Sequence, residues 1–279
     1  MRRMSVVLAA SALLLASCAQ DEQAAQDREV ATMAIEAADY TFRGAPATAE
    51  SGEVEITLTN TGTEPHQAQL FKVNEGVEIG QLVEEGKVPE AERNFSEFGT
   101  WAGGPNAVDA GETQVSVAQL EAGNYAFFCQ VPDAKGQAHL ALGMVAPLEV
   151  TQADDEAEGP SADFSSSAED FAFELPEQWT GTIAFENRGE QAHELQVIGV
   201  AEGKTPEDVE AWFKAAPGTA GPPAWTTGGG LAAIEPGDTG SFVADIEPGT
   251  YFAMCFVADP EKKAPHFALG MMQRFEVAE

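Results

Sequence analysis

Residues 125–144 of this 279-residue chain read YAFFCQVPDAKGQAHLALGM, and residues 251–271 read YFAMCFVADPEKKAPHFALGM. In each stretch an aromatic segment with strand character leads to a cysteine, and a histidine and a methionine follow. Alternate side chains of a strand share one face, so Tyr125, Phe127 and Cys129 should enter the core together. An upstream histidine completes each set of two His, one Cys and one Met. The two sets are His66, Cys129, His139 and Met144, and His193, Cys255, His266 and Met271.

The two sets use all four histidines of the chain and two of its three cysteines. Corresponding residues lie 127, 126, 127 and 127 positions apart, so the chain contains an internal repeat. Two imidazoles, one thiolate and a weak axial thioether form the ligand set of a mononuclear electron-transfer copper site. Zinc can use the His and Cys residues, but methionine is a poor ligand for it. The sequence therefore predicts one copper ion per repeat, and up to two per chain.

Hydrophobic periodicity predicts β-structure in both repeats. Val54, Ile56 and Leu58 alternate with polar residues, and Ile183 and Phe185 repeat the pattern. A period of two suits a half-buried strand. Short strands separated by Gly, Pro and Asn turns indicate an all-β fold of two antiparallel sandwiches.

One short helix is expected in each repeat, between the first histidine and the later strands. Residues 205–208, TPED, fit an N-cap, a proline at the first helical position and an acidic first turn. Val209, Trp212 and Phe213 follow on one face and should dock this helix on the sandwich. The first repeat has a weaker helical stretch around residues 79–88.

The N-terminus has the layout of a secretory signal. A positive start is followed by an apolar run from Val6 to Leu15, which is too short to span a membrane. Small residues before Cys18 resemble the lipobox of bacterial lipoproteins, which implies that Cys18 is lipidated. An ordinary signal peptide with an incidental cysteine is the alternative. We expect an extracytoplasmic protein, in the periplasm or at the cell surface, tethered to the membrane by its lipid.

Two polar stretches, rich in Ala, Gln and acidic residues, divide the rest of the chain. Each of the two segments between and after them is large enough for a core of its own. The predicted organisation is a signal peptide at 1–17, a tether at 18–35, a domain at 36–150, a linker at 151–162 and a second domain at 163–279.

The formal net charge is −32, and removal of Arg2 and Arg3 with the signal peptide leaves −34. Such acidity repels phosphates, so nucleic acid is excluded as a partner. Cysteines outside the cytoplasm usually form disulfides. A bridge between Cys129 and Cys255 would need equivalent interior positions of two domains to meet, so metal-held thiolates explain the pair better.

The segments YAFFC and HLALGM resemble the Cys strand and the H-x-x-x-G-M end of plastocyanin-type cupredoxins, and Asn60 with Pro65-His66 resembles their N-x-x-x-x-P-H loop. The resemblance covers about 230 residues, nearly the whole of both repeats. It implies two eight-stranded Greek-key sandwiches with copper at one end. It also implies imidazole ligands at His66, His139, His193 and His266, thiolates at Cys129 and Cys255, and axial thioethers at Met144 and Met271.

The chain departs from this family between the cysteine and the second histidine. Nine residues lie between Cys129 and His139, and ten between Cys255 and His266, where plastocyanin-like chains have two. Loop-closure cost grows only logarithmically with length, so the histidines can still reach a metal. We expect residues 130–138 and 256–265 to form mobile flaps over the metal end.

The function expected from these features is one-electron transfer with a redox protein as partner. The alternatives are copper handling, with delivery or sequestration of Cu(I) and a copper-trafficking partner, and a metal-free binding or scaffold module. A trinuclear copper site needs further histidines, and the chain has none to spare. We therefore expect that the protein is not an enzyme.

Overall fold

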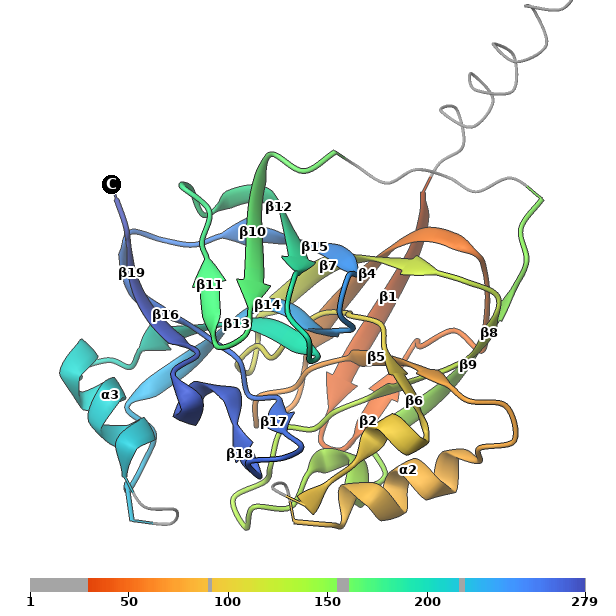
Figure 1. Ribbon diagram of the computed structural model, residues 1–279, viewed down its shortest axis with the longest axis horizontal. Helices are drawn as coiled ribbons and strands as arrows, with labels where there is room; N and C mark the ends of the chain where they lie inside the picture. The colour runs from red at the N-terminus through yellow and green to blue at the C-terminus, as the bar shows by residue number, and fades with distance from the viewer. Residues whose placement is uncertain (1–29, 90–91, 155–160, 216–218, 279) are drawn as a thin grey trace, which may run out of the picture.

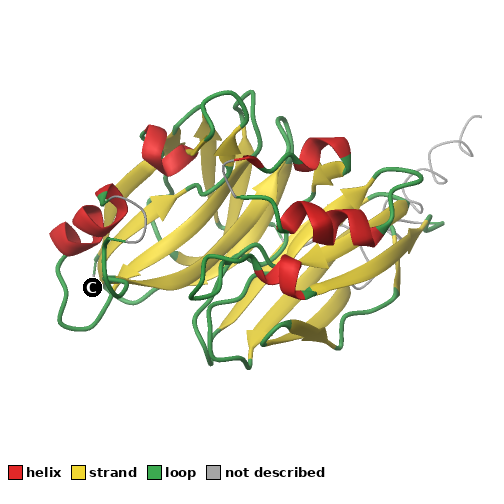
Figure 2. Cartoon of the chain, turned by 90° about the horizontal axis from the view of Figure 1, so that it is seen from below, coloured by secondary structure: helices red, strands yellow, loops and turns green. Residues whose placement is uncertain are grey.

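The structure is a computed structural model, and it describes residues 30–89, 92–154, 161–215 and 219–278. The predicted signal peptide, Cys18 and the first part of the predicted tether lie outside the described residues. Two β-sandwiches lie side by side (Figure 2). Among the described residues, no helix is both long and apolar enough to span a membrane.

The first sandwich consists of two sheets, with strand orders β2-β1-β4-β7 and β3-β9-β8-β5-β6. Its strands are β1 (Ala31–Ala38), β2 (Thr41–Arg43), β3 (Thr48–Glu50), β4 (Gly52–Asn60), β5 (Gln69–Val73), β6 (Gly99–Trp101), β7 (Thr113–Leu120), β8 (Gly123–Phe128) and β9 (Val145–Thr151). The predicted alternation is confirmed, because Val54, Ile56 and Leu58 of β4 are buried between the sheets.

The second sandwich repeats this plan with the strand orders β11-β10-β12-β15 and β14-β13-β16-β19. Its strands are β10 (Phe164–Glu169), β11 (Ala172–Glu174), β12 (Thr180–Asn187), β13 (His193–Val200), β14 (Trp225–Ile234), β15 (Thr239–Asp245), β16 (Gly249–Met254), β17 (Ala258–Asp259), β18 (Ala264–Pro265) and β19 (Met272–Val277). The prediction of two Greek-key sandwiches in an all-β chain is therefore confirmed.

The predicted helices are present, at opposite sides of the view in Figure 1. They are α2 (Ile79–Gly86) and α3 (Pro206–Lys214). At the start of α3, the Thr205 side chain accepts a hydrogen bond from the Asp208 N–H, and the Asp208 carboxylate accepts one from the Thr205 N–H. Leu82 of α2 and Val209 of α3 are fully buried against the outer faces of the sandwiches. The helices dock on the sandwiches as expected.

The first strand begins inside the predicted tether of residues 18–35. Residues 31–35 form the first half of β1, which pairs in parallel with β4. Met33 and Ile35 are buried, whereas Ala34 between them and the flanking residues 32 and 36 are exposed. A strand with one buried face needs an apolar residue only at every second position, so its composition resembles that of a polar tether.

The two domains share one continuous sheet, because β15 pairs with β7. The segments 102–108 and 228–234 also pair antiparallel, with Pro105 opposite Leu231 at the centre. These two residues are 126 positions apart, which is the offset of the repeat in this region. The interface is therefore isologous: equivalent segments of the two domains pair with each other, as they do across a two-fold axis.

Two buried glutamines at equivalent positions join the domains. The Gln69 side chain accepts a hydrogen bond from the Ala233 N–H and donates one to the Ala233 C=O. The Gln196 side chain makes the same pair of hydrogen bonds with Ala107. Each glutamine lies three residues after the first histidine of its set. The strands that follow these histidines are thus fixed to the neighbouring domain as well as to their own.

Candidate metal centres

Each ligand set gathers at one end of its sandwich from three different elements. His66 lies in the loop after β4, Cys129 follows β8, and His139 begins a short 3-10 helix (His139–Leu142). In the second domain His193 begins β13, Cys255 follows β16, and His266 begins the helix His266–Leu269. All six side chains are fully buried. The structure therefore brings together both predicted His-Cys-His groups.

The three ligand atoms of the first group form a compact triangle. His66 Nδ1 lies 3.0 Å from His139 Nδ1, and Cys129 Sγ lies 3.9 and 3.4 Å from these two atoms. The centre of the circle through the three atoms is about 2.0 Å from each of them, which is close to first-row metal–nitrogen bond lengths. A metal–sulfur bond is longer, at about 2.3 Å, so the ion would lie nearer to the two nitrogens than to Cys129 Sγ, and the three side chains can hold one metal ion.

The second group repeats this geometry. His266 Nδ1 lies 3.1 Å from His193 Nδ1, and Cys255 Sγ lies 3.8 and 3.4 Å from His193 and His266. The same construction again gives a centre about 2.0 Å from all three atoms. A trigonal His2Cys plane is the arrangement of mononuclear copper sites, so each group can hold one copper ion.

The two predicted axial methionines are fully buried in the same core clusters as the cysteines. The Cys129 N–H donates to the Met144 carbonyl, and the Met144 N–H donates to the His139 carbonyl. Cys255, Met271 and His266 are joined in the same way. These bonds place each methionine beside its ligand plane, and its role as a thioether ligand stays a prediction.

Burial determines the protonation of the cysteines. It raises the pKa of the Cys129 thiol to about 12, although the N–H groups of Gln67 and Val131 bond the sulfur and act in the opposite direction. Burial likewise raises the pKa of Cys255 well above its ordinary value. An unpaired thiolate in an apolar core is costly, and a bound cation removes that cost. The metal-free sites therefore hold neutral thiols, which must lose a proton when a metal binds.

The imidazoles of His139, His193 and His266 have lowered pKa values, so they are neutral and ready to bind a metal. Burial, followed by the proximity of His193, lowers the pKa of His266 to about 4. Burial and the proximity of His66 also lower the pKa of His139. Protons therefore compete with a metal for these nitrogens only in acid solution.

Sequence reasoning missed the residues that face the outer ring nitrogens. His66 Nε2 lies 3.0 Å from Asp39, and His139 Nε2 lies 3.3 Å from Glu64. The Tyr40 hydroxyl donates to Glu64 over 2.8 Å, and this bond raises the pKa of Tyr40 to about 12. The Asp39 hydrogen bond can orient His66 and fix its tautomer. The contact between His139 and Glu64 has the distance of an ion pair but not the geometry of a hydrogen bond.

In the second domain Asp170 lies 3.6 Å from His193 Nε2, and the side-chain amide oxygen of Gln191 lies 3.2 Å from His266 Nε2. A signal for these contacts was present in the sequence. The tripeptide Asp39-Tyr40-Thr41 with Phe42 matches Asp170-Phe171-Ala172 with Phe173, and Glu64 aligns with Gln191.

The long Cys–His connections are not mobile flaps, as we had expected, but compact hairpins. In the first, the Asp133 carboxylate accepts hydrogen bonds from the N–H groups of Lys135 and Gln137. In the second, β17 pairs with β18. Val131 and Val257 pack against the two cores, and each accepts a hydrogen bond from the N–H of the following ligand histidine. Polar composition indicated mobility, but here the carboxylates bond the turns internally.

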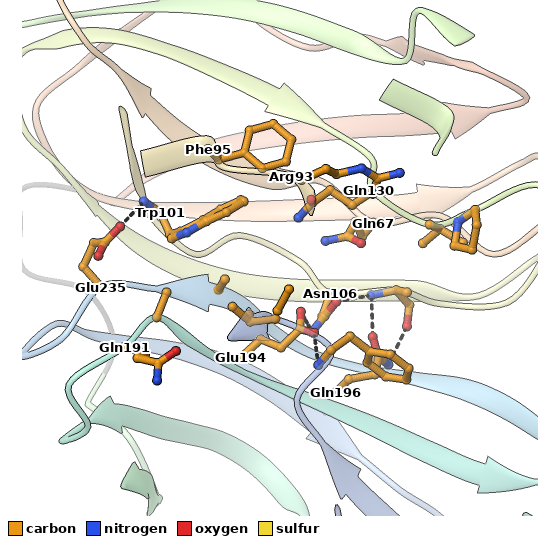
Figure 3. Close-up of a pocket in the computed structure, with 18 of the residues that line it drawn as sticks. Gln67, Arg93, Phe95, Trp101, Asn106, Gln130, Gln191, Glu194, Gln196 and Glu235 are labelled. Carbon is orange, nitrogen blue, oxygen red and sulfur yellow. Dashed lines mark hydrogen bonds between the residues drawn. The ribbon is translucent and has the colours of Figure 1, made fainter. Parts of the chain in front are cut away.

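A cavity of about 360 Å³ lies between the domains. Its walls include Gln67 and Gln130, which directly follow His66 and Cys129. They also include Glu194, whose carboxylate accepts hydrogen bonds from Asn106 of the first domain and from the Phe256 N–H (Figure 3). Neighbours of both candidate metal centres thus line one shared cleft.

The chain thus has a cupredoxin-like fold that occurs twice, and each copy contains one buried His-Cys-His group. No protein-family model matches the chain, and no curated protein matches it in sequence. Solved structures similar to it include auracyanin A, a blue copper protein from Chloroflexus aurantiacus, with 22% identity and a TM-score of 0.33 over 44% of this chain and all of that chain.

Two further solved structures are similar to the chain. An azurin from Methylomonas sp. strain J has 17% identity and a TM-score of 0.30 over 44% of this chain and 98% of its own. A multicopper oxidase has 14% identity and a TM-score of 0.28 over 88% of each chain. At these identities the likeness concerns the fold alone.

The oxidase corrects one expectation. The expectation that the protein is not an enzyme does not stand: the solved structures similar to this chain include an enzyme, the multicopper oxidase. The number of histidines, on which the prediction rested, excludes a trinuclear site and does not decide about enzymatic activity in general.

Proposed function

We propose that this protein is an extracytoplasmic copper protein, anchored to the membrane through Cys18, that transfers single electrons through one mononuclear type-1-like site in each domain. The preformed triangle of His66, Cys129 and His139 carries this proposal, together with its copy in the second domain. A bound copper ion supplies a reversible one-electron couple between Cu(II) and Cu(I).

The protein's part is to hold the ligands still and to exclude water. Two backbone hydrogen bonds fix His66: its N–H donates to the Val108 carbonyl, and its carbonyl accepts from the Val108 N–H. The His139 N–H bonds the Val131 carbonyl in the hairpin. All three ligand side chains are buried. Ligands held in this way change position little between oxidation states, which favours electron transfer.

The acidic surface supports a basic partner. With a net charge of −32, the chain attracts positively charged proteins at long range and repels acidic ones. We propose a redox protein with a basic docking surface as the partner. Association should therefore weaken as the salt concentration rises.

Copper loading of the purified chain tests the proposal. We expect two copper ions per chain and an intense visible thiolate-to-copper absorption. Cys129→Ser and Cys255→Ser should each remove one copper ion and about half of the absorption. Cys18→Ser is the matched control, because it removes a cysteine outside both sites and should leave both metals bound.

Other outcomes lead to other functions. A colourless Cu(I) adduct would support copper handling, and failure to retain copper would leave a binding or scaffold module. Retention of both metals in the Cys129→Ser/Cys255→Ser double variant would contradict the thiolate assignment.

A further inference from the structure

The cavity between the domains lies beside both candidate metal centres. In each domain its walls include the residue after the first histidine and the residue after the cysteine, which are Gln67 and Gln130 in the first domain and Glu194 and Phe256 in the second. The Gln67 N–H bonds the sulfur of Cys129, and the Glu194 N–H bonds the sulfur of Cys255. A molecule in this cavity would thus touch residues that contact both ligand sulfurs.

The size and the walls of the cavity suit an aromatic ring. Its volume of about 360 Å³ is that of a small-ligand site, and a cavity of about 150 Å³ already holds benzene. The walls contain aromatic side chains from both domains, Phe95 and Trp101 from the first and Trp225 and Phe256 from the second. Aromatic side chains stack on the faces of other rings or meet their edges, so these walls favour a flat ring as the ligand.

Two side-chain amides in the wall indicate that the ligand also has polar groups. Gln67 is only 6% exposed, yet its side chain makes no hydrogen bond with any described residue, and the Gln130 side chain makes none either. Most buried polar side chains have a partner. Figure 3 shows both amides on the side of the cavity opposite Glu194. An amide has donors and an acceptor, so a hydroxyl group of a ligand would satisfy it.

The charge of the walls disfavours anions. The described residues that line the cavity include three carboxylates, those of Glu190, Glu194 and Glu235, and one guanidinium, that of Arg93. Glu235 accepts a hydrogen bond from the Trp101 N–H over 2.9 Å, and burial raises its pKa. A carboxyl group accepts several hydrogen bonds, so Glu235 can also accept one from a ligand hydroxyl. The surplus of negative charge favours a neutral ligand with O–H donors over a carboxylate or a phosphate.

We propose that this cavity binds a neutral dihydroxybenzene, a hydroquinone, which delivers one electron to each of the two copper sites. This inference rests on the proposed function. The ring of a hydroquinone suits the aromatic walls, and its hydroxyl groups suit the two amides and Glu235. A hydroquinone also gives up two electrons, which is the number that two one-electron sites beside one cavity can take. Both O–H bonds break and a quinone remains, one electron goes to each Cu(II), and the two protons go to water. The proposed redox partner then takes the electrons from the two sites.

Binding to the copper-free chain tests the cavity without any metal. Anaerobic isothermal titration calorimetry should show one 1,4-hydroquinone bound per chain. 1,4-Dimethoxybenzene has no O–H donor and 4-hydroxybenzoate is an anion, so each should bind about tenfold more weakly. Gln67→Leu keeps the N–H of residue 67 and removes the amide, and it should weaken hydroquinone binding about tenfold.

Two further variants accompany Gln67→Leu. Gln119→Leu makes the same chemical change at an exposed position of β7 outside the cavity, and it should bind hydroquinone as the unchanged chain does. Gln130→Leu removes the other amide of the wall and should weaken binding as Gln67→Leu does. Circular dichroism of the copper-free variants checks that each one folds.

Anaerobic reduction of the copper-loaded chain tests the electron transfer. Each hydroquinone should bleach the visible absorption of two copper sites and yield one quinone, which is measured by its ultraviolet absorption. In Cys255→Ser, which keeps only the first site, one quinone should require two protein molecules. The rate of bleaching should level off as the hydroquinone concentration rises, and Gln67→Leu should need about ten times more hydroquinone for half of the maximal rate.

A rate that rises linearly with concentration and is equal in Gln67→Leu would overturn the inference, because it indicates reduction at the outer surface. Absence of hydroquinone binding to the copper-free chain, or equal binding of 4-hydroxybenzoate, would also overturn it. Failure of the proposed function would look different, because no coloured copper adduct would form, whereas hydroquinone would still bind to the copper-free chain.

Discussion

Mild acid should destabilise the copper-free protein, because His139, His193 and His266 are buried and have lowered pKa values. His266 is fully buried, and burial with the proximity of His193 lowers its pKa from 6.5 to about 4. In the unfolded chain a histidine takes up a proton near pH 6.5. Between pH 6.5 and about pH 4 the unfolded state therefore binds more protons than the folded state, so the free energy of unfolding falls as the pH falls.

The size of the effect follows from the two pKa values. The difference between 6.5 and about 4 corresponds to about 3 kcal/mol from His266 alone. The pKa values of His139 and His193 are lowered as well, so these residues act in the same direction. Asp259 titrates in a separate window, because hydrogen bonds led by the Lys262 N–H lower its pKa to about 2.

Urea unfolding of the copper-free protein at several pH values between 7.5 and 4 measures this effect. His266→Gln removes the titrating group and should reduce the loss of unfolding free energy over this range by about 3 kcal/mol. The two proteins are compared by how steeply the free energy of unfolding changes with pH. A difference in stability that is the same at every pH does not affect this comparison. The reasoning is refuted if His266→Gln loses as much stability as the unchanged chain.

Three further predictions concern the first site and the anchor. A Cβ atom on Gly62 would lie 2.6 Å from His66 Nε2 and would push this imidazole out of place. Gly62→Ala should therefore weaken copper binding at the first site by about 10- to 100-fold in a competition titration. Gly80→Ala is the control and should leave binding unchanged, because a Cβ atom there meets no atom within 4 Å. Replacing residues 130–138 by a two-residue connection should release copper from the first site, because it removes the hydrogen bond from the Val131 N–H to the Cys129 sulfur. Tighter copper binding in this variant would show that the hairpin is dispensable. Cys18→Ser should move the protein from the membrane to the soluble fraction, and unchanged sedimentation would show that Cys18 is not the anchor.

The sequence by itself determined the features that depend on short or repeated patterns. Cys129, His139 and Met144 lie within 16 residues, and their copies recur at nearly constant offsets, so both ligand sets could be recognised without coordinates. The strand β4 followed from alternation, and α3 from its N-cap, because these signals lie within a few neighbouring residues.

Only the tertiary structure decided the features that join distant parts of the chain. The first half of β1 is a strand because it pairs with β4, and its composition alone resembled a tether. The contacts of Asp39 and Glu64 with the ligand histidines depend on how loops from different strands meet. The pairing of residues 102–108 with 228–234 depends on two domains folding against each other. Such contacts leave no periodic trace along the sequence, because the partners are selected by the folded shape and not by their spacing.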